Sequence, residues 1–289
     1  MIGRNAWRWA MIGPAAALFA ALAVLPVVEL VQMSVHFVRW VRGKPVWNYV
    51  GLQQYFDVLN DSLFKAGILN TVVFAVVAVT IQVVLGFALA LMTTRIIHGR
   101  VFYRSVFLLP ILVPGIVIGA IWKLMYNFHF GVINQLTGLV GLPPLDWLGT
   151  IETAMGSVIA VDVWHWTPFV FLLMLTGLES LPQDVYEAAK VDGASFWQEL
   201  TLITLPMMLP TIIVTLVFRM IVAFKVFDEI YLLTGGGPGT STEVLSFTIY
   251  RRFFTEGLTG YGSAMSVMVL FSLSIAIVAV VLLSRRRGK

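Results

Sequence analysis

Long apolar runs separated by short polar segments dominate the chain. A helix that crosses a bilayer needs about 20 mostly apolar residues, and six runs reach that length. These runs lie at residues 10–34, 66–93, 105–126, 151–178, 205–232 and 263–283. The pattern therefore predicts an all-α polytopic membrane protein, in which residues 1–289 form a single domain of six transmembrane helices.

The first run could instead be a signal peptide, because Ala21-Leu22-Ala23 resembles a cleavage site. The apolar run continues through Pro26 to Val31, however, which is past the end of a short signal core. We therefore favour a first helix that stays in the membrane.

The composition agrees with a membrane protein. Hydrophobic residues make up 59% of the chain and charged residues only 12%, whereas soluble domains are about 25% charged. The chain has no cysteine, which excludes disulfides and thiolate metal sites. The histidines lack the spacing of metal ligands, so we expect no metal and no cofactor in this chain. They are His36, His98, His129 and His165.

Basic residues flank the apolar runs and indicate an orientation, because Lys and Arg gather on the cytoplasmic side of a membrane protein. With the N-terminus inside, the inner set is Arg4, Arg8, Arg95, Arg100, Arg104, Lys190, Arg285, Arg286, Arg287 and Lys289. The outer set is smaller and comprises Arg39, Arg42, Lys44, Lys65, Arg251 and Arg252. We expect a multi-pass protein of the cell membrane with both termini in the cytoplasm. The basic C-terminal end would contact anionic lipid. The sequence has no basic stripe with interleaved aromatic residues away from the membrane, so we expect no nucleic-acid partner.

One polar segment, at residues 180–205, interrupts the apolar pattern between the fourth and fifth runs. Pro182 and Asp184 suit the first turn of a helix, and Gly193 suits a left-handed helix end. Ser195 and Gln198 have the spacing of a capping box, which starts a second helix. The segment therefore predicts a short helix, a tight turn and another short helix on the cytoplasmic side.

This segment could be an ordinary amphipathic connector at the membrane surface, with Glu187 and Lys190 as a surface pair. Ala188-Ala189 favours a docked helix instead, because small side chains allow a partner surface to approach closely.

The same segment carries a family resemblance. Glu187-Ala188-Ala189, then Gly193, then Ile203-x-Leu205-Pro206 resembles the signature loop of permease subunits in binding-protein-dependent ABC importers. A second stretch, Leu232 to Pro238, is similar to the carbohydrate-uptake branch, especially to the larger maltose-type permease subunit. The short first external loop makes the chain more similar to the compact permeases for glycerol phosphate, trehalose and polyols. The resemblance covers the chain from about Asn70 onward.

The resemblance implies a transport subunit that is not itself an enzyme. Its partners would be a second permease subunit in a heterodimer, two ATPase subunits and an external substrate-binding protein, with ATP and Mg held by the ATPase chains. The residues that the resemblance assigns to ATPase coupling are Glu187, Ala188, Ala189, Asp192, Gly193, Ile203, Leu205 and Pro206.

Charged residues inside predicted spans mark a possible solute pathway, because such residues usually face a bundle interior or a water-filled path. Counting about 1.5 Å per residue from the cytoplasmic ends of their runs places Asp162 and Arg219 at similar depths. The two could therefore form a structural ion pair. Alternatively, Arg219 could bind an anionic group of the solute in a bidentate manner.

Aromatic residues follow Asp162 and suit a sugar pocket, because sugar rings pack on aromatic faces in mostly apolar sites. They are Trp164, His165, Trp166 and Phe169. By the resemblance, His165, Trp166, Phe169, Arg219, Val222, Ala223 and Val226 match substrate-contacting positions of the maltose-type subunit. Val222, Ala223 and Val226 are apolar, whereas the family has polar groups at several of these positions. A disaccharide bound in the way that the maltose-type subunit binds maltose is therefore not expected. The expected solute is a sugar, glycoside, polyol or sugar-like anion.

A secondary transporter driven by an ion gradient is the alternative, with Asp162, Arg219 and Asp228 as relay residues. That alternative leaves the polar segment at residues 180–205 unexplained.

A glycine pair in the third predicted span, Gly115-x-x-x-Gly119, fits close helix packing in the membrane.

Overall fold

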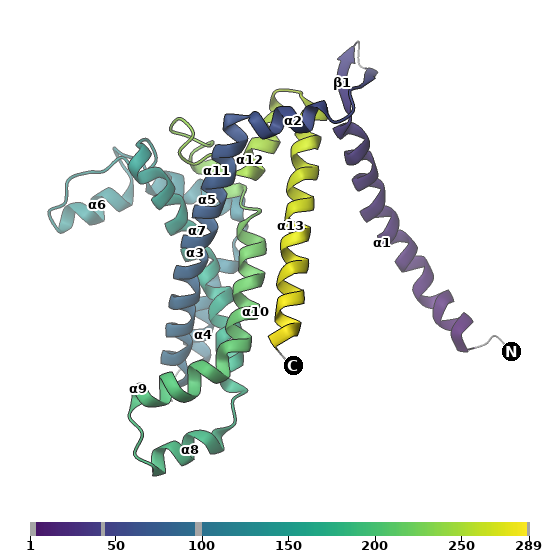
Figure 1. Cartoon of the computed structure of the whole chain (residues 1–289). Helices are drawn as coiled ribbons and strands as arrows, with labels where there is room; N and C mark the ends of the chain where they lie inside the picture. The colour runs from purple at the N-terminus through teal and green to yellow at the C-terminus, as the bar shows by residue number, and fades with distance from the viewer. Residues whose placement is uncertain (1–3, 42–43, 96–99, 288–289) are drawn as a thin grey trace. The chain divides into compact units, whose positions relative to one another are not determined.

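The computed structural model describes residues 4–41, 44–95 and 100–287, and these are mostly helical (Figure 1). The described residues form two compact units. The first unit draws on Met1–Lys65 and Thr248–Lys289, and the second is Ala66–Phe247. Of the basic residues expected at the chain ends, Lys289 lies outside the described residues, as do the side chains of Arg4, Arg8, Arg285, Arg286 and Arg287.

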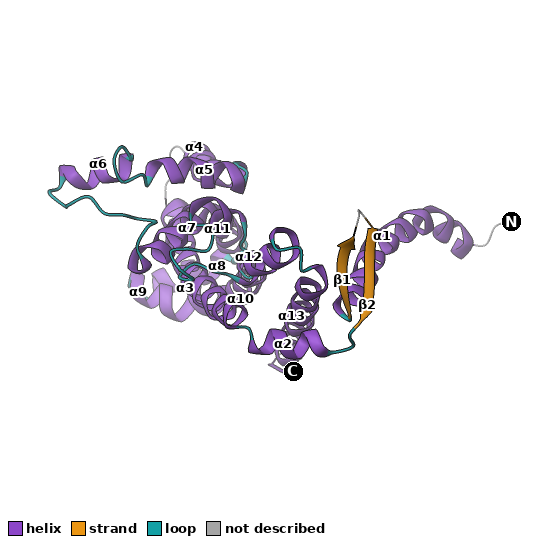
Figure 2. Cartoon of the chain, turned by 90° about the horizontal axis from the view of Figure 1, so that it is seen from above, coloured by secondary structure: helices purple, strands orange, loops and turns teal. Residues whose placement is uncertain are grey.

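The first unit contains a hairpin between its helices. Its elements are α1 (Arg4–Ser34), β1 (His36–Val41), β2 (Lys44–Tyr49), α2 (Gln53–Asn60) and α13 (Thr259–Arg287). The two strands pair in antiparallel register, with His36 opposite Tyr49 and Val41 opposite Lys44 (Figure 2). The expectation of an all-α protein is therefore wrong for this segment. Both strands are rich in aromatic and β-branched residues, which favours strands, and each is too short to register among runs of membrane-spanning length.

The second unit is built from helices alone among its described residues, and α3 and α12 extend beyond its borders. Its elements are α3 (Ser62–Arg95), α4 (Arg100–Leu108), the 3₁₀ turn η1 (Leu109–Leu112), α5 (Gly115–Met125), α6 (Val132–Leu139), α7 (Ile151–Glu179), α8 (Gln183–Val191), α9 (Phe196–Gln198), the π-helical η2 (Glu199–Thr204), α10 (Leu205–Ala223), α11 (Asp228–Leu233) and α12 (Leu245–Tyr250). The π-helical η3 (Arg251–Thr255) follows in the first unit.

Four helices in the described part of the chain are long and apolar enough to cross a membrane. They are Met11–Ser34, Ser62–Thr94, Ile151–Glu179 and Phe196–Ala223. The described apolar portion of α13, Thr259–Ile275, is too short to count among them by itself. The backbone of α13 as a whole is nevertheless helical over the entire sixth predicted run, residues 263–283.

The predicted third span, residues 105–126, is not one straight helix. The helices Arg104–Leu112 and Gly115–Met125 meet at an angle of 96°. Pro110 and Pro114 explain the bend, because proline lacks a backbone donor and cannot continue a regular helix. An apolar pattern does not register that break, and counting the bent pair as one broken span gives five spans in the described residues.

The predicted fifth span, residues 205–232, also differs. Its helix α10 ends at Ala223, and a separate helix, α11, begins at Asp228. Lys225 and Asp228 are exposed in this interval. Charged groups carry a large cost inside a bilayer, so the regular apolar helix stops before they accumulate.

Small residues bring the helices of the second unit close together. A Cβ added at Gly86 of α3 would lie 2.7 Å from Val170 Cγ1 of α7, and one at Gly177 would lie 2.9 Å from Met208 Cε of α10. Such close approach is how membrane helices gain packing contacts. The buried core at this junction comprises Ala90, Val170, Phe171, Met174, Leu175, Leu178 and Met208. The predicted close packing at Gly115 and Gly119 is also present, against Asp228 and Leu232 of α11.

Candidate functional site

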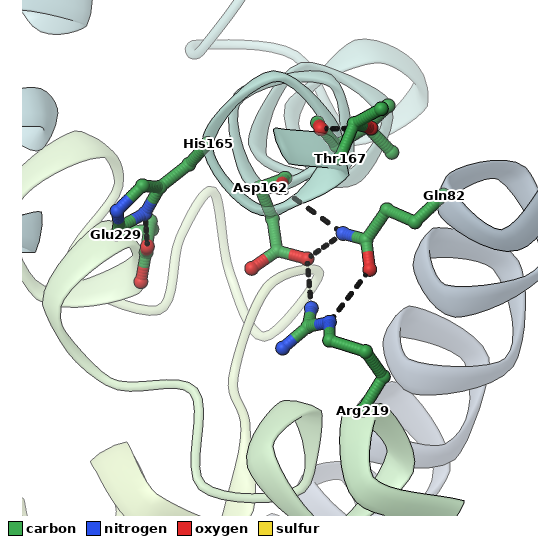
Figure 3. Close-up of polar contacts among 7 residues, drawn as sticks. Gln82, Asp162, His165, Thr167, Arg219 and Glu229 are labelled. Carbon is green, nitrogen blue, oxygen red and sulfur yellow. Dashed lines mark hydrogen bonds and ion pairs between the residues drawn. The ribbon is translucent and has the colours of Figure 1, made fainter. Parts of the chain in front are cut away.

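A buried group of three polar side chains joins α3, α7 and α10 (Figure 3). Arg219 Nη2 donates to Asp162 Oδ2 at 3.1 Å, and Arg219 Nε donates to Gln82 Oε1 at 2.8 Å. Gln82 Nε2 donates to Asp162 Oδ2 at 2.7 Å and to the Asp162 carbonyl oxygen at 3.1 Å. We call Gln82, Asp162 and Arg219 the polar clasp.

The polar clasp contains the ion pair that the similar depths of Asp162 and Arg219 allow. Their side chains are 3% and 0% exposed, so the pair is removed from solvent. A buried ion pair is tolerated only when further hydrogen bonds satisfy it, and Gln82 supplies them on both sides. Gln82 was not among the residues predicted from the sequence. Its signal is a single amide side chain within a long apolar run.

One nitrogen of the clasp has no partner. Arg219 Nη1 is buried and makes no hydrogen bond. The Arg219 guanidinium carbon lies 4.5 Å from the ring centroid of Trp166, over its face. This cation–π contact helps to hold the guanidinium in place but does not satisfy the Nη1 donor.

A cavity of about 390 Å³ lies against the clasp. Its lining residues are Gly115, Asp162, His165, Trp166, Arg219, Val222, Ala223, Lys225, Val226, Phe227, Asp228 and Glu229. The structure thus brings together seven of the nine predicted pathway residues: Asp162, His165, Trp166, Arg219, Val222, Ala223 and Val226. Its volume lies within the range of about 300–1,000 Å³ that is usual for small-molecule sites.

A second polar pair lies in the same cavity. His165 Nδ1 is 3.4 Å from Glu229 Oε1, and both residues are buried. Glu229 belongs to α11, a segment that was predicted to continue the fifth transmembrane helix. The turn at residues 224–227 brings Glu229 back towards α7, and the apolar pattern of the sequence does not predict that turn.

The two remaining predicted pathway residues lie elsewhere. Trp164 is exposed, contacts Trp122 edge-on at 5.6 Å, and lines a separate apolar cavity of about 760 Å³. Phe169 packs on Trp166 and on Phe218, at 6.1 Å and 5.1 Å between ring centroids, beside the clasp cavity. Helical periodicity explains the position of Trp164, because positions 162, 165, 166 and 169 share one face of α7 and position 164 does not.

The segment after α7 has the predicted helix, turn and helix. Asp184 lies in the first turn of α8 and Lys190 in its last turn. Gly193 has φ +73°, Ala194 N donates to Ala189 O at 2.9 Å, and Gly193 N donates to Lys190 O at 3.1 Å. These two bonds form a Schellman motif, which requires the left-handed residue at Gly193.

The second helix begins at the predicted capping box. Ser195 N donates to Gln198 Oε1 at 2.8 Å, and Gln198 N donates to Ser195 Oγ at 3.4 Å. A separate short helix was expected here. Instead, the helix continues through η2 into α10 as one apolar stretch, Phe196–Ala223. Pro206 lacks an N–H and so cannot make the regular α-helical bond, which agrees with the wider π-helical turn immediately before it.

Contacts hold α8 against this continuous helix. Tyr186 and Thr204 share a hydrogen bond of 3.1 Å between their hydroxyl groups. Ala189 is buried against the chain itself, whereas Glu187 and Ala188 are exposed. Figure 1 shows α8 and α9 beside each other at one end of α10. Only part of the Ala188-Ala189 pair therefore faces outward.

Within 4–41, 44–95 and 100–287, no cluster of three or more His, Asp or Glu residues could hold a metal ion.

Comparison with known families identifies the class to which this chain belongs. The family model for the binding-protein-dependent transport system inner membrane component matches residues 82–289. The chain therefore belongs to this family of ABC importer permeases, which are transport subunits rather than enzymes.

Individual relatives are sugar-transport permeases. The chain is 39% identical over 259 residues to the trehalose/maltose transport system permease protein MalF of Thermococcus litoralis, covering 89% of this chain and 86% of that protein. It is 33% identical over 272 residues to the sulfoquinovosyl glycerol transport system permease protein SmoG of Agrobacterium fabrum, covering 94% and 88%.

A solved structure shares the whole fold. A chain of a bacterial ABC transporter involved in the import of the acidic polysaccharide alginate matches with a TM-score of 0.87 and 25% identity, over 100% of this chain and 98% of that one. A second structure of a bacterial alginate transporter, in complex with an alginate pentasaccharide-bound periplasmic protein, matches with a TM-score of 0.83.

Proposed function

We propose that this chain is one of two permease subunits of an ATP-driven importer for a sugar, glycoside, polyol or sugar-like solute. An external binding protein would deliver the solute, and two cytoplasmic ATPase subunits would hold ATP and Mg. The observation that carries the proposal is the α8–Gly193–α9 segment, whose second helix is continuous with α10. Membership of the family and the sugar-transport relatives support it.

The α8 segment would act as the coupling helix, on the cytoplasmic side together with both termini. Its exposed residues Glu187, Ala188 and Asp192 would face the ATPase, while Ala189 would anchor α8 to its own chain. The full coupling set remains Glu187, Ala188, Ala189, Asp192, Gly193, Ile203, Leu205 and Pro206.

The physical requirement for coupling is a stiff connection. ATP-driven closure of the ATPase pair can move the spans only if force passes through the loop without being lost in its bending. The Schellman motif, the capping box and the Tyr186–Thr204 bond each restrict bending of the segment. Displacement of α8 would thereby reach α10 and the Arg219 end of the polar clasp.

The clasp cavity would form this chain's part of the solute pathway. Trp166, Val222, Ala223 and Val226 offer mostly apolar walls, and Arg219 and His165 offer polar anchors, as small-solute sites usually do. Trp164 and Phe169 would act indirectly, by packing beside this region.

Purification of the chain from membranes of its native host tests the proposal. We expect an ATPase and a second permease to co-purify, and proteoliposomes containing the complex and its binding protein to take up solute only with ATP. Uptake that needs no ATPase and stops when an ion gradient is collapsed would instead establish a secondary transporter, with the Asp162, Arg219 and Asp228 carboxylate and guanidinium groups as the candidate relay.

A further inference from the structure

The polar clasp leaves one guanidinium nitrogen, Arg219 Nη1, available to a ligand. Arg219 is 0% exposed, and its Nη1 is the one guanidinium nitrogen without a hydrogen-bond partner. Figure 3 shows this nitrogen directed away from Asp162 and Gln82, towards the side where His165 and Glu229 lie. An unsatisfied buried donor has an energetic cost, so a ligand oxygen at this position would be stabilised.

The charge of Arg219 is already balanced. Its Nη2 is bonded to the Asp162 carboxylate, which also receives the Gln82 amide. The spare Nη1 therefore belongs to a paired cation and offers a hydrogen bond, whereas an anion would need net positive charge to offset its desolvation.

The rest of the cavity carries no excess of positive charge. Glu229 and Asp228 add two carboxylates to that of Asp162, and Lys225 is the only other permanent cation among the lining residues. A charged His165 would at most balance Glu229. An anionic group at Arg219 would therefore approach an excess of carboxylates or, at best, a neutral set.

We propose that this site takes an uncharged polyhydroxyl solute, and that Arg219 Nη1 donates a hydrogen bond to one of its hydroxyl or ring oxygens. The inference rests on the proposed transport function and narrows its substrate class. A hydroxyl of the same solute can donate to the Glu229 carboxylate, since hydroxyl groups both donate and accept. Val222, Ala223 and Val226 supply apolar surface for the C–H faces of the ring.

The test uses the intact complex in lipid nanodiscs without its binding protein, because the receptor has a selectivity of its own. Saturation-transfer NMR would measure binding of maltose, trehalose and methyl glucoside, and of methyl glucuronide, which differs from the glucoside by one carboxylate. We expect signals from at least one neutral probe and none from the glucuronide. A signal from the glucuronide of equal or greater strength, or no signal from any neutral probe, would overturn the proposal.

Charge variants locate the selectivity. Asp162→Asn frees the positive charge of Arg219 and should raise the ratio of glucuronide to glucoside binding at least about tenfold. Glu229→Gln removes the same charge but leaves Arg219 paired, so it should change the ratio less. Equal effects of the two variants would show that the net charge of the cavity, rather than Arg219, controls selectivity, and would contradict the assignment to Arg219.

Failure of the neutral-solute inference can be distinguished from failure of the proposed importer function. Since Asp162→Asn removes a partner from a buried ion pair and is destabilising, the wild-type comparison of probes is sufficient by itself. A complex that hydrolyses ATP and transports solute but prefers the glucuronide would refute only the neutral-solute inference. A chain that purifies without any ATPase would refute the proposed ATP-driven transport function.

Discussion

Arg219 illustrates how a fully charged side chain is accommodated in a membrane protein. Its guanidinium is bonded to one carboxylate and one amide and lies over the Trp166 ring. Such pairing offsets only part of the cost of removing charge from water, so the pair is weak evidence for stability and better evidence for function. Both partners of the ion pair lie on the wall of the same cavity, which agrees with a functional role.

Loss of Gln82 should destabilise the polar clasp. In Gln82→Leu, Arg219 Nε loses its acceptor and Asp162 loses two hydrogen bonds, which should cost about 1–3 kcal/mol. The apparent melting temperature of the purified complex should therefore fall. Val84→Ala, two residues away on the exposed side of α3, is the matched control and should change little. An unchanged melting temperature in Gln82→Leu would show that the clasp bonds are not needed for folding.

Asp61 forms a second polar cluster, in the first unit and before the start of α3. Its Oδ1 accepts from Leu63 N at 2.7 Å and Phe64 N at 3.2 Å, and its Oδ2 accepts from Arg252 Nη2 at 2.8 Å and Tyr261 at 3.0 Å. Burial acts to raise the pKa of Asp61. The hydrogen bonds and the Arg252 charge outweigh burial, and the net pKa lies below the usual value. Asp61 therefore caps the first turn of α3 and, within the first unit, joins this turn to Arg252 and Tyr261.

This cluster predicts a pH dependence. Because the folded pKa is lowered, the stabilisation by Asp61 is fully present above the unfolded value of about 3.9 and is lost as pH falls through the folded pKa. Asp61→Asn should therefore be less stable than wild type at neutral pH, with the difference shrinking below about pH 4. Thermal unfolding across this pH range measures it, with Asp57→Asn, an exposed neighbour on α2, as control. A difference that is constant with pH would contradict the assigned ion pair.

At the scale of elements, close approach of α3 and α7 at Gly86 positions Gln82 beside Asp162. A Cβ at Gly86 would lie 2.7 Å from Val170 Cγ1 and 2.9 Å from Phe171 N, which is a backbone atom and cannot move alone. Gly86→Ala should therefore separate the helices and lower both stability and transport. Gly156→Ala on α7 is the matched control, because nothing lies within 4 Å of its Cβ. Removing a helical glycine should leave that variant as stable as wild type or slightly more stable.

A Gly86→Ala variant with wild-type melting temperature and uptake would show that this contact is not limiting. Local flexibility would then have to absorb the overlap with Val170 and Phe171.

Local chemistry explains which elements the sequence predicted well. Gly193, Ser195 and Gln198 act through bonds within a few residues, and their turn and cap were predicted and are present. The bend near Pro110 and the turn after Ala223 were missed, because average hydrophobicity does not respond to a single proline or to charges near a helix end.

Long-range contacts account for the site residues that were not predicted from the sequence. Gln82 and Glu229 join the site only through packing of α3 and α11 against α7, 80 and 64 residues away along the chain from their partners. Asp162 and Arg219 could be paired from the sequence because the depth of a residue in a membrane helix follows from its position along the helix. The depth of a residue does not say towards which side of its helix the side chain points. Trp164 was therefore predicted to line the pathway, but it lies on another face of α7.

At the scale of the whole molecule, the proposed transport cycle depends on force passing from α8 to α10. Gly193 is the residue at which that connection can be altered with least disturbance. A Cβ there meets nothing within 4 Å, so a substitution is opposed by its left-handed φ of +73° and not by crowding. Asn tolerates this conformation and a β-branched residue does not.

The most direct test of coupling is therefore the amount of solute transported per ATP hydrolysed, in proteoliposomes that contain the complex and its binding protein. We predict that Gly193→Val inserts and assembles normally but transports much less solute per ATP than wild type, whereas Gly193→Asn stays close to wild type. Wild-type transport per ATP in Gly193→Val would contradict the assignment of α8 and Gly193 as the coupling element.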